Sequence, residues 1–351
     1  MQKERNLLVN TSANLKDVAA AAGVSVSTAS RALAGKTIIS EDTRNRVQAA
    51  AQKLNYKPNI QARGLRTART YTIGLSIPTL VNPFFATMAA AIQENATAHG
   101  LSTIITSYDE DALTLKNTVN ALYQHQVDGM IVVPSAKATQ ELEHIAQLGV
   151  PLVLIDRVLT DCSLPAVVSH PDPGIYAALE HLVEQGHHHI GFLAGPAELS
   201  TGAGRLQAFR TAHAALLDNT QEHIFYGGFE VTQGHRGARA LLDAGATAII
   251  AGDSMMTLGA MEYCHAHEVH IGDDVALVGF DDLVYMRVQP TPLSVIDQDV
   301  VAMGQQAVQL LVNWMSRAQP PPEQEIIAID TTFIPRASTT KGTSKKKLIR
   351  R

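Results

Sequence analysis

The chain has 351 residues, of which 46% are hydrophobic and 17% charged, a balance typical of a globular protein of roughly two to three domains. It contains no run of about 18 apolar residues, which argues against a transmembrane helix and against a membrane partner. The two cysteines, Cys162 and Cys264, are too few and too widely spaced for a disulfide framework or a metal-type motif, and they suggest reduced thiols in a cytoplasmic protein.

The formal charge of −5 is unevenly distributed along the chain. Residues 1–66 hold 11 Lys and Arg against 4 Asp and Glu, a charge of +7, and residues 341–351 hold six Lys and Arg and no acid, a charge of +6. The part between them therefore carries −18. A basic head on an acidic body is typical of a nucleic-acid-binding protein, although basic termini are also found as plain solvated surface.

The first 13 residues lack periodicity and an apolar stretch, so we expect a flexible leader and no secretory signal. Residues 14–57 predict three short helices. Asn14 is the expected N-cap of the first, Gly23 ends it, a second helix ends near Leu33, and Ser40 opens a third. Two short helices joined by a tight turn indicate a helix-turn-helix unit.

The second of these helices, V-S-T-A-S-R-A-L, presents Val26, Ser27, Thr28 and Arg31 outward if its alanines face the first helix. In a helix-turn-helix this element enters the DNA major groove, where an arginine pairs bidentately with guanine. The alternative is a structural helix pair with a solvated polar face.

Residues 58–70 form a mixed linker, and from residue 71 short apolar strands alternate with helices. The expected strands are 72–77, 102–106, 129–133, 152–155, 190–193, 224–226, 248–251 and 275–279, and the expected helices are 84–99, 113–125, 138–148, 175–184, 205–217, 234–244 and 255–267. This order predicts an α/β fold of parallel sheets in two similar lobes over residues 71–340, followed by a basic tail over 341–351. A ligand is expected in the crevice where the strands end.

Several motifs carry a family resemblance that runs from about Asn14 to Arg336. They are N-L-K-D-V-A-A-A-A-G-V-S-V-S-T-A-S-R-A-L, L-N-Y-K-P-N, A-R-G-L-R, T-I-G-L, N-P-F-F, V-D-G-M-I-V, P-L-V-L-I-D-R, E-Q-G-H-H-H-I-G-F-L-A-G, G-F-D-D and I-D-Q-D. With these motifs the chain resembles the lactose-repressor family of bacterial transcription regulators. The resemblance implies a helix-turn-helix head, a hinge helix and a two-lobed core like that of periplasmic binding proteins.

The resemblance implies that Val26, Ser27 and Arg31 read bases and that the linker forms a hinge helix in the minor groove. Leu65 would be the wedge between base steps, flanked by Arg63 and Arg66. Gly64 departs from the family pattern, because such hinges usually carry a better helix former at this position. Glycine costs about 1 kcal/mol of stability in a helix. We therefore expect the hinge to need DNA and a paired partner for stability.

The resemblance also implies an effector pocket similar to that of ribose-binding proteins and ribose-type repressors. Its residues are Asn82, Phe84, Phe85, Asp156, Arg157, Ser169, Arg205, Phe229, Asp253, Asp281 and Gln298. Asp253 and Val133 stand where that pattern usually has asparagine. Ribose or a ribonucleoside such as uridine is the expected effector; other pentoses or hexoses, purines and phosphosugars are the alternatives. Asp156–Arg157 as a lobe-stabilising ion pair, Phe84 and Phe85 as core, and Asp281 as a helix cap are the structural alternatives.

Other function classes fit less well. Gly202-Ala203-Gly204 lacks the third glycine of a dinucleotide loop, and no phosphate-binding loop, nucleophile elbow or H-E-x-x-H occurs. The run His187–His189 points its side chains in different directions and does not indicate a metal. We expect no enzyme, cofactor or metal. A solute-binding protein is the remaining rival, and the basic head argues against it.

The expected function is that of a homodimeric repressor on a palindromic DNA operator, released when a small sugar-type effector closes the lobes. The alternative is the same fold answering to a purine or another sugar as co-repressor.

Overall fold

The computed structural model describes residues 13–34, 37–56, 69–217, 221–317 and 324–340. The chain divides into two compact units, Met1–Thr70 and Tyr71–Arg351, which are described separately below as the head and the body. In the described residues no helix combines the length and apolar character needed to cross a membrane.

The head consists of α1 (Leu15–Ala22), α2 (Val26–Leu33) and α3 (Glu41–Lys53). Asn14 caps α1 in a reciprocal capping box with Asp17, and Gly23 ends the helix in the left-handed conformation at φ 65°. The hydroxyls of Ser25 and Ser40 cap α2 and α3. The predicted three-helix arrangement is thus confirmed, including the caps at Asn14 and Ser40.

The core of the head is small. Val18 of α1, Ala29 of α2 and Val47 of α3 are fully buried, and alanines make up most of the rest. Such short side chains let the three helices approach closely but bury little apolar surface each. The head therefore depends on its helix caps as well as on its core.

The body has two lobes, and each is built on a six-stranded sheet. The first lobe contains β1 (Thr72–Ile77), α5 (Pro83–Ala98), β2 (Ser102–Ser107), α6 (Ala112–Gln124), β3 (Gly129–Val132), α7 (Thr139–Gln147), β4 (Leu152–Ile155), β5 (Ala166–His170), α13 (Val300–Ser316) and β11 (Ile326–Asp330). Its strand order is β11-β5-β4-β3-β1-β2, with every neighbouring pair parallel.

The second lobe contains α8 (Asp172–Glu184), β6 (Ile190–Ala194), α9 (Ser200–Leu216), β7 (His223–Tyr226), α10 (Val231–Asp243), β8 (Ala248–Ala251), α11 (Ser254–Ala266), β9 (Ala276–Phe280), α12 (Val284–Arg287), β10 (Ser294–Asp297), β12 (Thr332–Ile334) and a short 3₁₀ helix (Ala337–Thr339). Its strand order is β12-β10-β9-β8-β6-β7. Only the edge strand β12 runs antiparallel to its neighbour among these strands.

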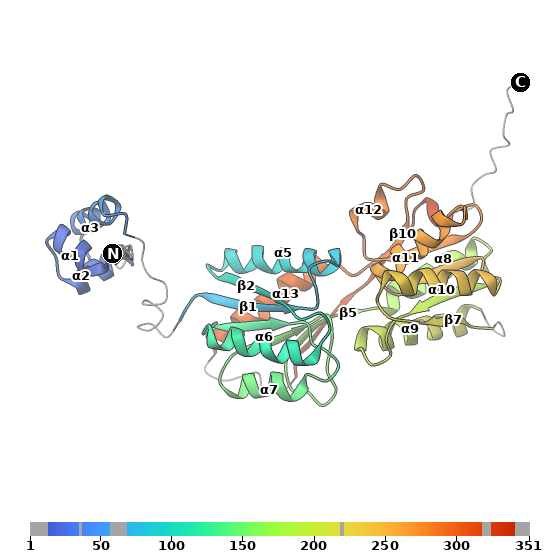
Figure 1. The fold of residues 1–351 in the computed structure, drawn as a ribbon, viewed down its shortest axis with the longest axis horizontal. Coiled ribbons are helices and arrows are strands. Elements are labelled where there is room, and N and C mark those ends of the chain that lie inside the picture. Colours follow the sequence, from blue (N-terminus) through green and yellow to red (C-terminus); the bar gives the residue numbers. More distant parts are fainter. Residues whose placement is uncertain (1–12, 35–36, 57–68, 218–220, 318–323, 341–351) are drawn as a thin grey trace, which may run out of the picture. The chain divides into compact units, whose positions relative to one another are not determined.

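The chain passes between the lobes three times: from β5 to α8, from β10 to α13, and from β11 to β12. In Figure 1, α13 accordingly lies in the first lobe, where it packs against α5, although it follows β10 in sequence. The two lobes are therefore tied by three crossings rather than by one linker.

Helices cover both faces of each sheet, as parallel strands require. Along β6, Phe192 packs into the cluster on one face of the second lobe and Leu193 into the cluster on the other. The predicted α/β class and two-lobed architecture are confirmed. Four strands (β5, β10, β11 and β12) and two helices (α12 and α13) were not predicted.

The observed bounds differ from the predicted ones mainly at helix starts. The largest difference is α9, which begins at Ser200, whereas the sequence predicted a start at Arg205. No side chain caps this helix end, and the run S-T-G-A-G is typical of a loop. Arg205 therefore lies inside α9, with a full helical turn before it, and the prediction that it opens the helix is wrong.

Candidate functional site

A cavity of about 530 Å³ lies between the two lobes of the body. Ten of the eleven predicted pocket residues line it: Asn82, Phe84, Phe85, Asp156, Arg157, Arg205, Phe229, Asp253, Asp281 and Gln298. Its volume is within the range of small-molecule sites in proteins. The geometry thus brings residues from both lobes to one crevice at the carboxyl ends of the strands.

Two of the carboxylates follow directly after strands, Asp156 after β4 and Asp281 after β9. Both residues are in the left-handed region, at φ 71° and φ 65°. Aspartate is one of the few non-glycine residues that adopt this conformation readily. The sharp turn at each strand end directs a short carboxylate into the crevice.

Two more pocket residues also serve as helix caps. The Asn82 side chain accepts a hydrogen bond from the backbone of Phe84 at the start of α5, and Asp253 accepts from Met255 and Met256 at the start of α11. Capping fixes both side chains at the cavity wall.

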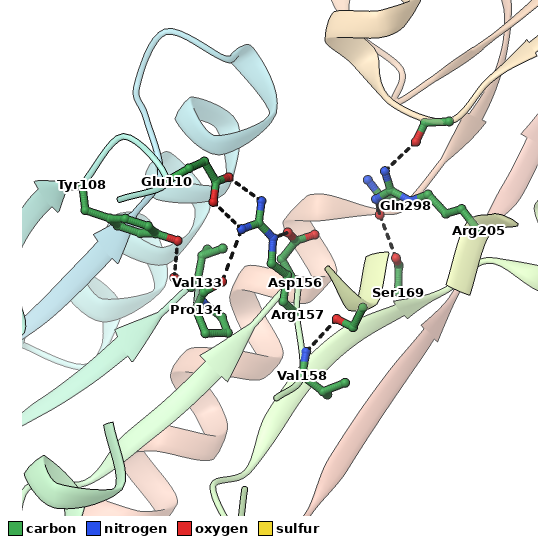
Figure 2. Close-up of polar contacts among 12 residues, drawn as sticks. Tyr108, Glu110, Val133, Pro134, Asp156, Arg157, Val158, Ser169, Arg205 and Gln298 are labelled. Atoms are coloured by element: carbon green, nitrogen blue, oxygen red, sulfur yellow. Dashed lines mark hydrogen bonds and ion pairs between the residues drawn. The ribbon is translucent and has the colours of Figure 1, made fainter. Parts of the chain in front are cut away.

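Gln298 connects both lobes within the pocket. Its Oε1 accepts hydrogen bonds from Ser169 Oγ at 2.7 Å and from Arg205 Nη2 at 2.8 Å (Figure 2). Its Nε2 donates to Asp281 Oδ1. Gln298 lies on the crossing from β10 to α13, and Ser169 lies on β5 just before the crossing to α8. The pocket is thus hydrogen-bonded to two of the three crossings.

Ser169 differs from the other predicted residues because it does not line the main cavity. It lines a smaller neighbouring cavity of about 170 Å³ that shares Asp156 and Arg205. Ser169 therefore contacts Gln298, which lines the main cavity, without lining that cavity itself.

Arg205 is held from four sides. Its Nη1 donates to the carbonyl of Gly252 at 2.7 Å, and its guanidinium lies 4.2 Å from the ring centroid of Phe280 and 5.7 Å from that of Phe229. The side chain is 5% exposed. Two aromatic faces and two fixed acceptors leave one orientation for the guanidinium.

Three buried carboxylates share this region. Burial raises the pKa values of Asp156, Asp253 and Asp281, and that of Asp281 rises to about 7 although the Arg205 cation opposes the shift. In the part of the chain that is described, no three His, Cys, Asp or Glu side chains are grouped so as to hold a metal ion.

Several buried polar atoms at the cavity have no hydrogen-bond partner among the described residues. They are Ser135 Oγ, Asp156 Oδ1, Arg157 Nε, Thr201 Oγ1 and Arg205 Nε. Buried polar atoms are usually paired, so this set of donors and acceptors matches a ligand that offers several hydroxyl groups.

Ser135 was missed by sequence reasoning, which considered Val133 for this wall. Val133 is fully buried and does not line the cavity, and its carbonyl accepts a hydrogen bond from Tyr108. Two residues on, Ser135 reaches the cavity because it lies beyond the end of β3.

Glu110 was also missed. Its carboxylate binds the Arg157 guanidinium with both oxygens, at 2.6 and 2.8 Å, as Figure 2 shows. Asp156 Oδ2 lies 3.4 Å from Arg157 Nε. The Asp156–Arg157 ion pair therefore exists, but Glu110 is the closer partner. The run D-E-D after the strand 102–107 was the available signal, since it occupies the same strand-end position as the other pocket residues.

In the head, Val26, Ser27 and Arg31 are exposed on α2. The Thr28 hydroxyl is half-buried and bonds the Ser25 hydroxyl at 2.8 Å, so it belongs to the helix cap as well as to this face. Arg31 makes no hydrogen bond or ion pair within the described residues. The predicted hinge residues Arg63, Leu65 and Arg66 lie outside the described residues.

A helix-turn-helix head followed by a two-lobed body with a polar crevice defines the class of ligand-responsive DNA-binding regulators. Residues 14–59 match the family described as "Bacterial regulatory proteins, lacI family", and residues 179–339 match the "Periplasmic binding protein-like domain". The chain is 31% identical to the ribose operon repressor of Halalkalibacterium halodurans, over 93% of this chain and 97% of that protein. The chain belongs to the lacI family of bacterial regulatory proteins.

Other relatives extend this comparison. The HTH-type transcriptional repressor PurR of Actinobacillus pleuropneumoniae serotype 3 is 31% identical over 86% of this chain and 90% of its own length. Among solved structures, a probable LacI family regulator from Corynebacterium glutamicum is 40% identical, with a TM-score of 0.71 over 77% of this chain and 99% of that one. The Lac repressor dimer bound to operator is 26% identical, with a TM-score of 0.82 over 93% of this chain and 99% of that one.

Proposed function

We propose that this repressor binds a palindromic operator as a homodimer and that α2 reads the bases. Val26, Ser27 and Arg31 lie on the exposed face of α2, and Arg31 has no competing partner among the described residues, which supports a role in the major groove. Thr28 contributes from the helix start. Arg63, Leu65 and Arg66 complete the interface as a hinge in the minor groove.

The proposed effector is ribose or a ribonucleoside such as uridine. The observation that supports this effector is the set of buried, unpartnered polar atoms around Asp156 and Arg205, which lie in the same cavity as the aromatic rings of Phe84 and Phe229. A sugar ring needs both donors and acceptors at its rim and apolar contact on its face. The ribose operon repressor of H. halodurans supports the same choice.

The second candidate is a purine acting as co-repressor, and the aromatic lining of the cavity favours it. Phe84, Phe85 and Phe229 offer aromatic surface for a base as well as for a sugar. The two candidates differ in polarity, because a purine base carries no hydroxyls for the unpartnered atoms near Asp156.

Effector binding is proposed to act through the crossings. Gln298 and Ser169 lie on or beside two of them. Gln298 bonds Arg205 and Asp281 in the pocket, and Ser169 bonds Gln298. A ligand that binds the closed form of the lobes more tightly shifts the protein toward that form. Closure then releases the operator, with a coupling of about 1–3 kcal/mol.

The test is thermal unfolding of the full chain with ribose, uridine, other pentoses, hexoses and purines. A true effector at 100 times its Kd adds about 2.7 kcal/mol of stability. Ribose or uridine is expected to raise the Tm and to release DNA that the protein has selected from a random pool.

Arg205→Ala is expected to abolish this shift, because it removes a guanidinium that lines the cavity and has an unpartnered Nε. Arg239→Ala is the matched control: Arg239 is exposed on α10, pairs with Asp243 and lies outside the cavity. A shift with purines alone, accompanied by tighter DNA binding, would refute the ribose assignment and establish the co-repressor.

A further inference from the structure

The pairing of Glu110 with Arg157 is a fork-to-fork contact. Arg157 Nη2 donates to Glu110 Oε1 at 2.6 Å and Nη1 donates to Oε2 at 2.8 Å. The Arg157 side chain is 3% exposed, whereas that of Glu110 is 47% exposed. Glu110 thus covers a buried cation from the cavity side.

The loop that carries Glu110 is fixed at several points. Tyr108 is fully buried and donates its hydroxyl to the carbonyl of Val133, and the backbone of Asp109 donates to the carbonyl of Pro78 at 2.8 Å. Asp111 caps α6 through Thr114. Glu110 itself is held at φ 59°, a conformation that a glutamate adopts only when its surroundings impose it.

These contacts occupy most of the donors of Arg157. Besides its two bonds to Glu110, Nη1 donates to the carbonyl of Pro134 at 3.3 Å, and Nε lies 3.4 Å from Asp156 Oδ2. A guanidinium has five N–H groups, and binding a phosphate bidentately needs two of them on one edge. Nε makes no hydrogen bond to the described residues, but the Asp156 carboxylate lies on that side of the guanidinium. Both the end and the Nε side of Arg157 therefore face a carboxylate, which opposes the approach of an anion.

The other charged side chains that line the cavity also disfavour an anionic ligand. The described residues that line it include two arginines, Arg157 and Arg205, and seven carboxylate side chains: Asp109, Glu110, Asp156, Glu198, Glu230, Asp253 and Asp281. Arg205 is already bonded to Gly252 and Gln298. An anionic ligand would therefore meet a surplus of like charge in the cavity.

We propose that Glu110 is a specificity-determining residue that holds Arg157 out of reach of anions, so that the pocket accepts uncharged, polyhydroxylated effectors and rejects their phosphate esters. This inference rests on the proposed function in taking the crevice as the effector site, and it narrows the effector to an unphosphorylated compound.

The test compares the wild type with Glu110→Gln in the full-length protein, using ribose, ribose 5-phosphate and inorganic phosphate as probes. Glutamine keeps the size of the side chain but removes the charge that neutralises Arg157. The ratio of the ribose 5-phosphate Kd to the ribose Kd is expected to fall about 10- to 100-fold, as expected for one charge-assisted hydrogen bond. Inorganic phosphate is expected to raise the Tm of the variant and not that of the wild type.

Two further variants separate this effect from a change in net charge. Glu141→Gln removes the same charge from an exposed pair with Lys116 in the same lobe, outside the cavity, and is expected to gain no phosphate binding. Adding Arg157→Gln to Glu110→Gln is expected to remove the gain. Equal phosphate responses in Glu110→Gln and Glu141→Gln would overturn the proposal, and so would an Arg157-dependent phosphate response in the wild type.

The phosphate arm does not depend on ribose. If ribose and uridine leave the Tm of the wild type unchanged while Glu110→Gln still gains phosphate binding through Arg157, the proposed effector is wrong and the role of Glu110 stands. If ribose binds to the wild type and Glu110→Gln gains no phosphate binding, the proposed effector stands and the proposed role of Glu110 is wrong.

Discussion

At the scale of single residues, Arg31 is the side chain on which base reading is proposed to depend most. Its exposed position on α2 and its lack of a partner in the described residues leave the guanidinium available to a guanine edge. Arg31→Ala is expected to weaken operator binding by about 1–3 kcal/mol and to reduce the preference for operator over random DNA. Competition binding with both DNAs measures this.

Arg46→Ala is the control for Arg31. Arg46 is exposed on α3 and pairs with Asp42. Its loss is expected to lower binding to both DNAs to a similar degree, because only a general positive charge is removed. An unchanged preference in Arg31→Ala would contradict the assignment.

The pocket residues were predicted from the family resemblance, and four of them also follow a strand that the sequence predicts. Asp156, Asp253 and Asp281 could be placed in this way, together with Asn82. Glu110 follows a strand too, but its importance comes from the geometry of its contact with Arg157, which lies 47 residues later. A pattern of residue types does not show which of several neighbouring acids reaches a distant arginine.

At the scale of elements, the crossings carry their own polar contacts. His170 ends β5, and its ring bonds Asp330 at the end of β11 at 2.8 Å and Asp172 at the start of α8 at 2.7 Å. The ring therefore links two of the three crossings. The hydrogen bond to Asp330 raises the pKa of His170 above its usual value, with Asp172 contributing and partial burial opposing.

Because the folded-state pKa is raised, the stabilisation by this pair is complete below the unfolded pKa of about 6.5 and is lost as the pH rises through the folded value. His170→Gln is expected to be less stable than the wild type at pH 6, by less than about 1 kcal/mol since the ring is about half exposed. The difference is expected to shrink by pH 8. Urea unfolding at both pH values measures it.

The control is His270→Gln. His270 also bonds an aspartate, Asp274, but this pair is exposed and lies within one loop. A pH-dependent loss as large in His270→Gln as in His170→Gln would show that the crossings are not involved.

The helices and strands that the sequence analysis did not predict were missed for different reasons. Helix α13 has a clear apolar stripe, including Met303, Ala307 and Leu311, and its period could have been found from the sequence. Strand β11 is short and partly exposed, and its partner β5 lies about 160 residues earlier. Pairing over such a distance leaves no local signal, so the third crossing required the structure.

At the scale of the whole molecule, operator release and effector binding are two sides of one equilibrium. If the effector lowers operator affinity by a certain factor, the operator must lower effector affinity by the same factor. Titrating the proposed effector, ribose, into the repressor with and without operator is expected to show Kd values that differ by about 5- to 150-fold. Equal Kd values would mean that the crevice is not coupled to the head.

The three crossings also determine the order in which the body can be completed during synthesis. The first lobe is begun at β1, yet its core needs Met303 and Leu311 of α13, and its sheet needs β11. Most of the second lobe, from α8 to β10, emerges from the ribosome before those parts do. The lobe that is started first is thus finished late, and a nascent chain that stops before residue 300 carries a nearly whole second lobe beside an exposed, incomplete first one.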